Sequence, residues 1–221
     1  MHYPDVCLLL QSLVDEALLT KTERSVAGSE TTSVALRMAL CALLTTPSAY
    51  RKLQDEIDAF YAENSGDVIS YAEVKKLPYL QAVLRESLRL WPPPAGLFSK
   101  QVPESGDTVH GYYLPPGTEV GQSLIGIGRT RELFGADSDI FRPERWLEAS
   151  PQQLEEMAST VDLVFSSAKY LCLGKHIALM ELAKLLAEVC FSSSFYFARV
   201  LIFNDRYSDA TTLPRSTTLC L

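Results

Sequence analysis

The chain has 221 residues, of which 47% are hydrophobic, enough for one domain with a core or for two small domains. Its formal net charge of −7, without clusters of lysine or arginine, argues against nucleic acid as a partner. Its five cysteines have no Cys-x-x-Cys spacing, which fits a reducing compartment and predicts neither a zinc site nor a disulfide framework.

The sequence predicts no membrane-spanning or targeting segment. No apolar run approaches the ~20 residues that a membrane-spanning helix needs. Residues 7–14 are apolar, but the run is short and lacks a basic start, so we expect no signal peptide. Residues 1–25 are weakly helical and predict no defined element.

The first clear helix is predicted over residues 26–44, which are mostly apolar, with Arg37 as the charge in their apolar part. It begins with Ala27-Gly-Ser-Glu-Thr-Thr32, where a glycine costs a helix roughly 1 kcal/mol relative to alanine. Serine and threonine hydroxyls can bond to the carbonyl one turn earlier and bend the helix. A bend of small residues would leave space for a small ligand. An acid beside an alcohol, Glu30 and Thr31, would give a route for protons. Taken alone, these residues also fit an N-cap, with a hydroxyl capping and the acid on the helix dipole.

Further helices are predicted downstream. Pro47 opens a helix over residues 47–63, and Ser70-Tyr-Ala-Glu73 has the form of a capping box. A helix over residues 79–91 ends at Pro92-Pro-Pro94.

Glu86 and Arg89 lie at positions i and i+3 of the helix over residues 79–91, where side chains meet. Taken alone, such a pair is most often solvated on the surface and contributes little to stability.

A small β element is predicted between the helices. Residues 108–114 and 119–127 have the composition of strands, and they flank Pro115-Pro-Gly-Thr118, a typical turn sequence.

Cys172 lies in a loop of small residues, Phe165-Ser-Ser-Ala-Lys-Tyr-Leu-Cys-Leu-Gly-Lys175. Residues 173–189 predict a helix that begins at or just after this cysteine and is buried on most sides, because only one narrow stripe is polar. A cysteine at a helix N-terminus feels the positive end of the dipole, which favours thiolate over thiol. A thiolate in an apolar pocket suits a haem iron as axial ligand. Taken alone, such a cysteine is more often an inert buried thiol.

These segments, in this order, resemble the cytochrome P-450 (haem-thiolate monooxygenase) family. Residues 27–32 match its oxygen-binding segment, Ala/Gly-Gly-x-Asp/Glu-Thr-Thr, without departure. Glu86-Ser-Leu-Arg89 resembles its Glu-x-x-Arg helix, and Phe141-Arg-Pro-Glu-Arg-Trp146 resembles its Phe-x-Pro-Glu-Arg-Phe/Trp segment. The sequences of these motifs are most similar to those of filamentous-fungal members.

The loop around Cys172 is similar to the family's cysteine-ligand loop, Phe-x-x-Gly-x-Arg-x-Cys-x-Gly. Phe165, Cys172 and Gly174 match at the right spacing. Ala168 replaces the first glycine, and Tyr170 replaces the arginine.

The resemblance implies haem b as cofactor and a role for each matching residue. Cys172 would be the fifth ligand of the haem iron, and Glu30 and Thr31 would deliver protons to dioxygen. Lys100 falls where the family has an arginine that binds a haem propionate. Lysine keeps the positive charge but lacks the bidentate fork of arginine.

The resemblance also implies that Glu86, Arg89 and Arg145 form a buried structural network, because buried charges persist only when paired. Gly128 falls where the family often has a histidine near the propionates, and supplies no side chain there. We therefore expect Gly128→His together with Tyr170→Arg to improve haem retention.

The fold implied is mainly α with a small β element, as the C-terminal portion of the cytochrome P-450 fold, incomplete in this chain. Residues 1–221 would form one partial domain with an unassigned tail over 199–221. The reaction implied is insertion of one oxygen atom from O2 into a small organic substrate, with electrons from NADPH through a flavoprotein reductase. The location implied is the endoplasmic-reticulum membrane, although this chain has no anchor and would otherwise be cytoplasmic.

Two alternatives remain open. The chain could be a non-catalytic remnant that binds haem weakly or not at all, which the altered propionate positions favour. It could also be a half-protein that docks onto a partner supplying a missing N-terminal half.

Overall fold

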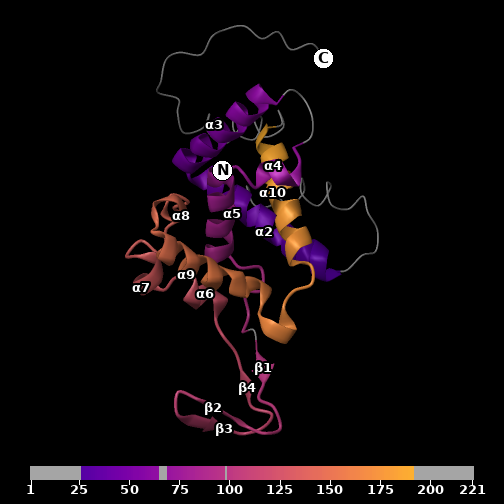
Figure 1. The fold of residues 1–221 in the computed structure, drawn as a ribbon, viewed down its shortest axis with the longest axis vertical. Helices are drawn as coiled ribbons and strands as arrows, with labels where there is room; N and C mark the ends of the chain where they lie inside the picture. Colours follow the sequence, from indigo (N-terminus) through magenta and orange to yellow (C-terminus); the bar gives the residue numbers. More distant parts are fainter. Residues whose placement is uncertain (1–25, 65–68, 98, 192–221) are drawn as a thin grey trace.

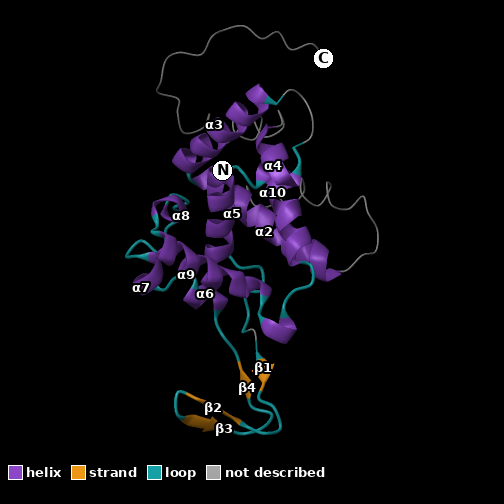
Figure 2. Cartoon of the chain, viewed as in Figure 1, coloured by secondary structure: helices purple, strands orange, loops and turns teal. Residues whose placement is uncertain are grey.

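The computed structural model describes residues 26–64, 69–97 and 99–191 (Figure 1). In these ranges the fold is mainly α, with two small antiparallel sheets, as expected (Figure 2). The weakly helical segment 1–25 and the tail 199–221 lie outside the described residues. Among the helices that the structure describes, none is both long and apolar enough to cross a membrane.

Helix α2 (Val26–Thr45) is the apolar helix predicted near the start of the chain. Its second half is almost entirely buried, including Leu40 and Leu43. The Thr45 hydroxyl donates to the Cys41 carbonyl at 2.8 Å, and Pro47 then begins α3 (Pro47–Glu63). A proline lacks the N–H that would continue α2, so the break falls between the two helices.

Helix α5 (Pro78–Leu90) lies in the middle of the helical body and contacts α2, α3 and α10 (Lys175–Phe191). The short helix α4 (Tyr71–Val74) precedes it and begins with the predicted capping box, in which Ser70 N donates to Glu73 Oε2 at 2.8 Å. The four long helices bury a common core, which these apolar residues of α2, α3, α5 and α10 represent: Leu36, Leu43, Leu53, Ile57, Leu80, Val83, Leu182 and Leu186.

Glu56 of α3 caps the N-terminus of α5. Its two carboxylate oxygens accept hydrogen bonds of 2.8 Å from Tyr79 N and Leu80 N, which are among the N–H groups that a helix start leaves without intrahelical partners. Burial raises the pKa of Glu56, although these two bonds act in the opposite direction. The carboxylate thus fixes α3 against α5.

The β element differs from the prediction. Residues 108–114 do not form one strand, because His110 (φ 50°) and Gly111 (φ 84°) turn the chain between β2 (Asp107–Val109) and β3 (Tyr112–Leu114). Strand β4 (Glu119–Val120) pairs instead with β1 (Lys100–Gln101), with Lys100 opposite Val120.

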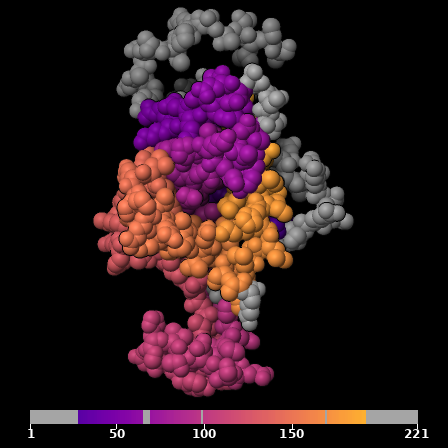
Figure 3. Space-filling view, in the orientation of Figure 1, coloured from indigo at the N-terminus to yellow at the C-terminus, as the bar shows by residue number. Residues whose placement is uncertain are grey.

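The predicted strand over residues 119–127 is also shorter than expected. Its second half is the helix α6 (Leu124–Ile127), because the Ser123 hydroxyl accepts from Gly126 N at 3.1 Å and caps a helical turn. Together β1 to β4 form a projection that stands away from the helical body (Figure 3). Tyr112 and Tyr113 of β3 are exposed.

After α6, short helices return the chain to α10 along one side of the body (Figure 1). They are α7 (Arg131–Phe134), α8 (Arg145–Glu148), α9 (Pro151–Asp162) and the 3-10 helices η1 (Leu163–Phe165) and η2 (Ala168–Tyr170). Their order brings residues 141–146 against α5 and residues 165–174 to the start of α10.

Candidate functional site

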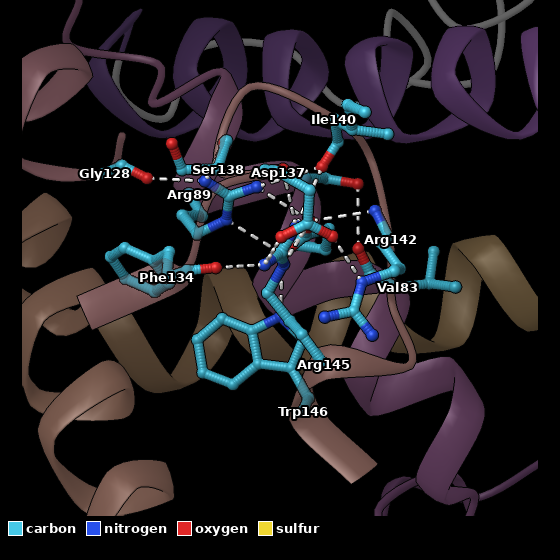
Figure 4. A network of polar contacts seen from close by, with 12 residues as sticks. Val83, Arg89, Gly128, Phe134, Asp137, Ser138, Ile140, Arg142, Arg145 and Trp146 are labelled. Atoms are coloured by element: carbon cyan, nitrogen blue, oxygen red, sulfur yellow. Dashed lines mark hydrogen bonds and ion pairs between the residues drawn. The ribbon is translucent and has the colours of Figure 1, made fainter. Parts of the chain in front are cut away.

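A network of polar contacts that includes Arg89, Arg145 and Trp146 joins two distant parts of the chain (Figure 4). At its centre is a buried carboxylate, Glu86 of α5. It accepts from Arg89 Nε at 2.9 Å and Nη2 at 2.8 Å, and from Arg145 Nε and Trp146 Nε1 at 2.9 Å each. Arg142 N donates to it as well, at 2.9 Å. The side chains of Glu86 and Arg89 are 0% exposed and that of Arg145 is 3% exposed, so this is no surface pair.

Both arginines place their remaining N–H groups on main-chain carbonyls. Arg89 donates to the carbonyls of Gly128, Ser138 and Ile140, and Arg145 donates to those of Phe134, Asp137 and Ile140. A buried guanidinium keeps its charge only when its donors are satisfied, and these carbonyls do so.

Asp137 extends the network toward the surface. Burial would raise the pKa of its carboxyl, but hydrogen bonds from Arg142 and Arg145 hold that pKa below its ordinary value. Its Oδ2 lies 2.7 Å from Arg142 Nε and its Oδ1 lies 3.1 Å from Arg145 Nη1.

Gly128 packs closely on the end of α5. A Cβ built at this position would lie 2.3 Å from the Arg89 carbonyl oxygen, much closer than two such atoms approach. The expectation that Gly128→His helps haem retention is therefore opposed by the structure, because any side chain would displace the backbone that accepts from Arg89.

Glu144, the acid of the Phe-Arg-Pro-Glu-Arg-Trp segment, links this segment to α3 and α5. It accepts from Lys52 Nζ at 2.6 Å and from the Tyr79 hydroxyl at 2.9 Å. Burial would raise the pKa of Glu144, but the bonds from Lys52 and Tyr79 lower it, while burial and Glu144 raise the pKa of Tyr79. Sequence reasoning missed Lys52 and Tyr79, because no spacing links them to position 144.

The loop before α10 has an unusual backbone. Ser166 has φ 61° and ψ −170°, and Ala168 has φ 50°, so two residues with side chains occupy conformations that favour glycine. Cys172 N donates to the Phe165 carbonyl at 2.9 Å and closes the loop. The conformation at position 168 accounts for the glycine that the family has there.

Cys172 is exposed, so it is not the inert buried thiol of the alternative interpretation, whereas Cys41 and Cys190 are buried. Helix α10 begins at Lys175, slightly later than predicted, because Leu173 and Gly174 form a turn. Around the cysteine, the apolar side chains of Leu171 (52%), Leu173 (101%) and Ile177 (59%) are exposed. The thiol therefore lies on an open apolar surface and not in an apolar pocket.

Lys100 reaches this loop from the projection. Its ammonium lies 4.5 Å from the centroid of the Tyr170 ring, within the range of a cation–π contact. The two residues that depart from the family's arginines are thus neighbours in space.

Glu30 and Thr31 are exposed on the first turns of α2. The helix begins at Val26 and continues through Gly28, so neither residue caps it. The Ser33 hydroxyl bonds back to the Glu30 carbonyl at 2.9 Å, as expected for hydroxyls in this segment. Helices α2 and α10 contact each other, and in Figure 1 they begin at the same end of the body.

A sequence profile described as Cytochrome P450 matches residues 11–191 of the chain. The chain belongs to the cytochrome P450 family. It is 46% identical over 168 residues to the cytochrome P450 monooxygenase ABA1 of Pyricularia oryzae, a match that covers 74% of this chain and 32% of that protein. It is 46% identical over 169 residues to the cytochrome P450 monooxygenase abl1 of Leptosphaeria maculans, covering 73% of this chain and 29% of the relative.

A third relative is the cytochrome P450 monooxygenase ACRTS1 of Alternaria alternata, 39% identical over 165 residues, with 74% of this chain and 44% of that protein covered. The similarity to fungal members that the sequence wording predicts is therefore confirmed. The chain spans about a third of the length of the first two relatives.

Membership of the cytochrome P450 family implies haem, and the residues around Cys172 fit that group. Cys172 presents an accessible sulfur, which is the ligand that a haem-thiolate centre needs. The exposed apolar Leu171 and Leu173 suit the face of a porphyrin, and Lys100 suits a carboxylate.

Proposed function

We propose that this chain is a haem-dependent monooxygenase that inserts one oxygen atom from O2 into a small organic substrate, with Cys172 as the axial ligand of the iron. The observation that carries the proposal is the exposed Cys172 thiol on a closed loop, bordered by exposed apolar side chains and approached by one lysine. Monooxygenase relatives support the reaction class.

Each residue of the proposed site has a distinct task. The Cys172 sulfur would hold the iron as thiolate, and Leu171 and Leu173 would shield the bound group from water. The Lys100 ammonium, held over the Tyr170 ring, would pair with a propionate carboxylate of haem b. Bound haem supplies the redox chemistry that activates dioxygen.

Glu30 and Thr31 serve as the proton route. The Glu30 carboxylate takes a proton from solvent, to which it is exposed, and the Thr31 hydroxyl passes one on toward the reacting oxygen.

The proposed partners follow from the reaction. Monooxygenation consumes two electrons, which we assign to an NADPH-dependent flavoprotein reductase, and O2 and a small organic molecule are the substrates. We propose the endoplasmic-reticulum membrane as the location, on family membership alone.

A second candidate is a chain without catalysis of its own, either a remnant that loses haem or a half-protein that docks onto a partner with the remaining part of the fold. Leu173 and Ile177 are 101% and 59% exposed, and such exposed apolar side chains favour a surface that a partner covers. Ala168 has a positive φ, which is unfavourable for a residue with a side chain. A less stable loop around Cys172 would bind haem more weakly.

The test is a difference spectrum of the purified chain with added haem, reduced and bound to carbon monoxide. The proposal expects a Soret band of the thiolate type, red-shifted from that of histidine-ligated haem. The band must disappear in Cys172→Ala and persist in Cys190→Ala, which removes a buried thiol as a matched control. Haem lost on desalting would favour the second candidate, and a band unchanged in Cys172→Ala would refute the ligand assignment.

A further inference from the structure

We infer that Lys175 is a positioning residue, which holds the loop of residues 163–174 so that Cys172 is presented in one conformation. The inference rests on the proposed role of Cys172. Lys175 is the first residue of α10, and its ammonium lies 2.8 Å from Asp162 Oδ2 at the end of α9 and 5.4 Å from the centroid of the Phe165 ring. One side chain thus joins both ends of the loop.

The loop needs an external hold because its own backbone is unfavourable. Ser166 and Ala168 have positive φ values of 61° and 50°, which L residues with side chains adopt at a cost and retain only where surrounding contacts impose them. Hydrogen bonds from Ser166 N to the Leu163 carbonyl and from Cys172 N to the Phe165 carbonyl lie within the loop. The contacts of Lys175 act from outside it.

Lys175 is well placed for this task. Its side chain is only 19% exposed, whereas that of Asp162 is 56% exposed, so the ammonium is held between an acid and an aromatic face. Phe165 itself packs against the hydrophobic core. Because Phe165 also accepts from Cys172 N, a fixed Phe165 fixes the cysteine backbone.

The alternative is that Lys175 and Asp162 form an ordinary surface pair with little effect on the loop. The pair Lys52–Glu144 provides a control outside the loop. Its ammonium and carboxylate are 2.6 Å apart, and the Lys52 side chain is exposed to solvent.

The first measurement is hydrogen–deuterium exchange of the haem-free chain, read in the peptide that covers residues 163–174. Lys175→Met, which loses both the ion pair and the cation–π contact, is expected to raise the exchange rate of the Cys172 amide about fivefold, and Asp162→Asn, which loses only the ion pair, is expected to raise it less. Lys175→Arg, which keeps both, is expected to restore the wild-type rate. Lys52→Met is expected to leave it unchanged, and unchanged protection in α5 shows that each variant folds.

The second measurement uses the haem-loaded chain. The fraction of the reduced carbon-monoxide complex with the thiolate-type band is expected to fall in Lys175→Met and to recover in Lys175→Arg. Exchange that does not change in Lys175→Met, or faster exchange with an unchanged thiolate fraction, overturns the inference and leaves the role of Cys172 standing. A wild-type chain without any thiolate band overturns the proposed function, and the positioning role with it.

Discussion

The Lys100 ammonium lies 4.5 Å from the centroid of the Tyr170 ring, which joins β1 to the loop of Cys172. At both positions the family has arginines that bind haem propionates. The two departures are therefore neighbours in space, and the ring of Tyr170 lies within cation–π range of the Lys100 ammonium.

We predict that Lys100→Met weakens haem binding and that Tyr170→Leu weakens it about threefold, because the ring no longer orients the ammonium. Tyr170→Phe keeps the cation–π contact and is expected to bind within about twofold of the wild-type chain. Haem titration followed at the Soret band measures each affinity. Haem with both propionates esterified provides the control, and a loss in Lys100→Met that persists with this ester would contradict the carboxylate assignment.

Glu86→Gln should lower the free energy of unfolding by about 3–5 kcal/mol, because it leaves Arg89 buried without its acid and Arg145 with Asp137 alone. Urea denaturation followed by far-UV circular dichroism measures the change. Asp139→Asn, in the exposed pair with Arg129, is the control and should cost less than about 1 kcal/mol. Equal losses of unfolding free energy in the two variants would show that the buried network stabilises the chain no more than an exposed ion pair.

Replacing Ala168 by glycine should stabilise the chain by about 1 kcal/mol, because its φ of 50° lies in the left-handed region. The same substitution at Ala158, inside helix α9, should destabilise by about 0.5–1 kcal/mol. Thermal unfolding measures the Tm of both variants, which should shift in opposite directions. A lower Tm for Ala168→Gly would mean that the loop adopts another conformation.

A methyl group at position 128 should destabilise the chain by about 1–3 kcal/mol, since it would overlap the Arg89 carbonyl. Gly28→Ala is the control. Among the described residues, no atom outside its own helix backbone lies within 4 Å of the new Cβ, so helix propensity alone should raise stability by up to ~1 kcal/mol. Opposite shifts in Tm are expected, and a neutral Gly128→Ala would mean that α5 and α6 separate easily.

The stability of the chain should fall between about pH 10 and pH 12 in a way that Tyr61→Phe reduces. Burial, and then the hydrogen bond to Glu188 at 2.9 Å, raise the pKa of Tyr61 from 10.0 to about 12. A raised pKa in the folded state means that the folded chain holds the proton longer than the unfolded chain. The stabilisation is therefore complete below pH 10 and lost as the pH rises through 12. Urea midpoints at several pH values measure this, and parallel curves for the two chains would rule out Tyr61 as the source.

Local spacing in the sequence was enough to predict the long helices, since apolar periodicity, capping boxes and prolines act within a few residues. The i, i+3 spacing of Glu86 and Arg89 predicted that the two side chains meet. It did not predict burial, which depends on Trp146, on Arg145 and on the carbonyls of Gly128, Ser138 and Ile140, which only folding brings to α5.

The same distinction holds at the candidate site. The sequence by itself determined that Cys172 lies in a loop before an apolar helix, within segments that belong to the cytochrome P450 family. Only the tertiary structure decided that this thiol is exposed, that Lys100 meets Tyr170, and that Lys175 joins Asp162 to Phe165. The strands were mispredicted for a related reason, since composition indicates where a strand is favoured, but the turn at His110 and Gly111 and the pairing of β1 with β4 decide where it forms.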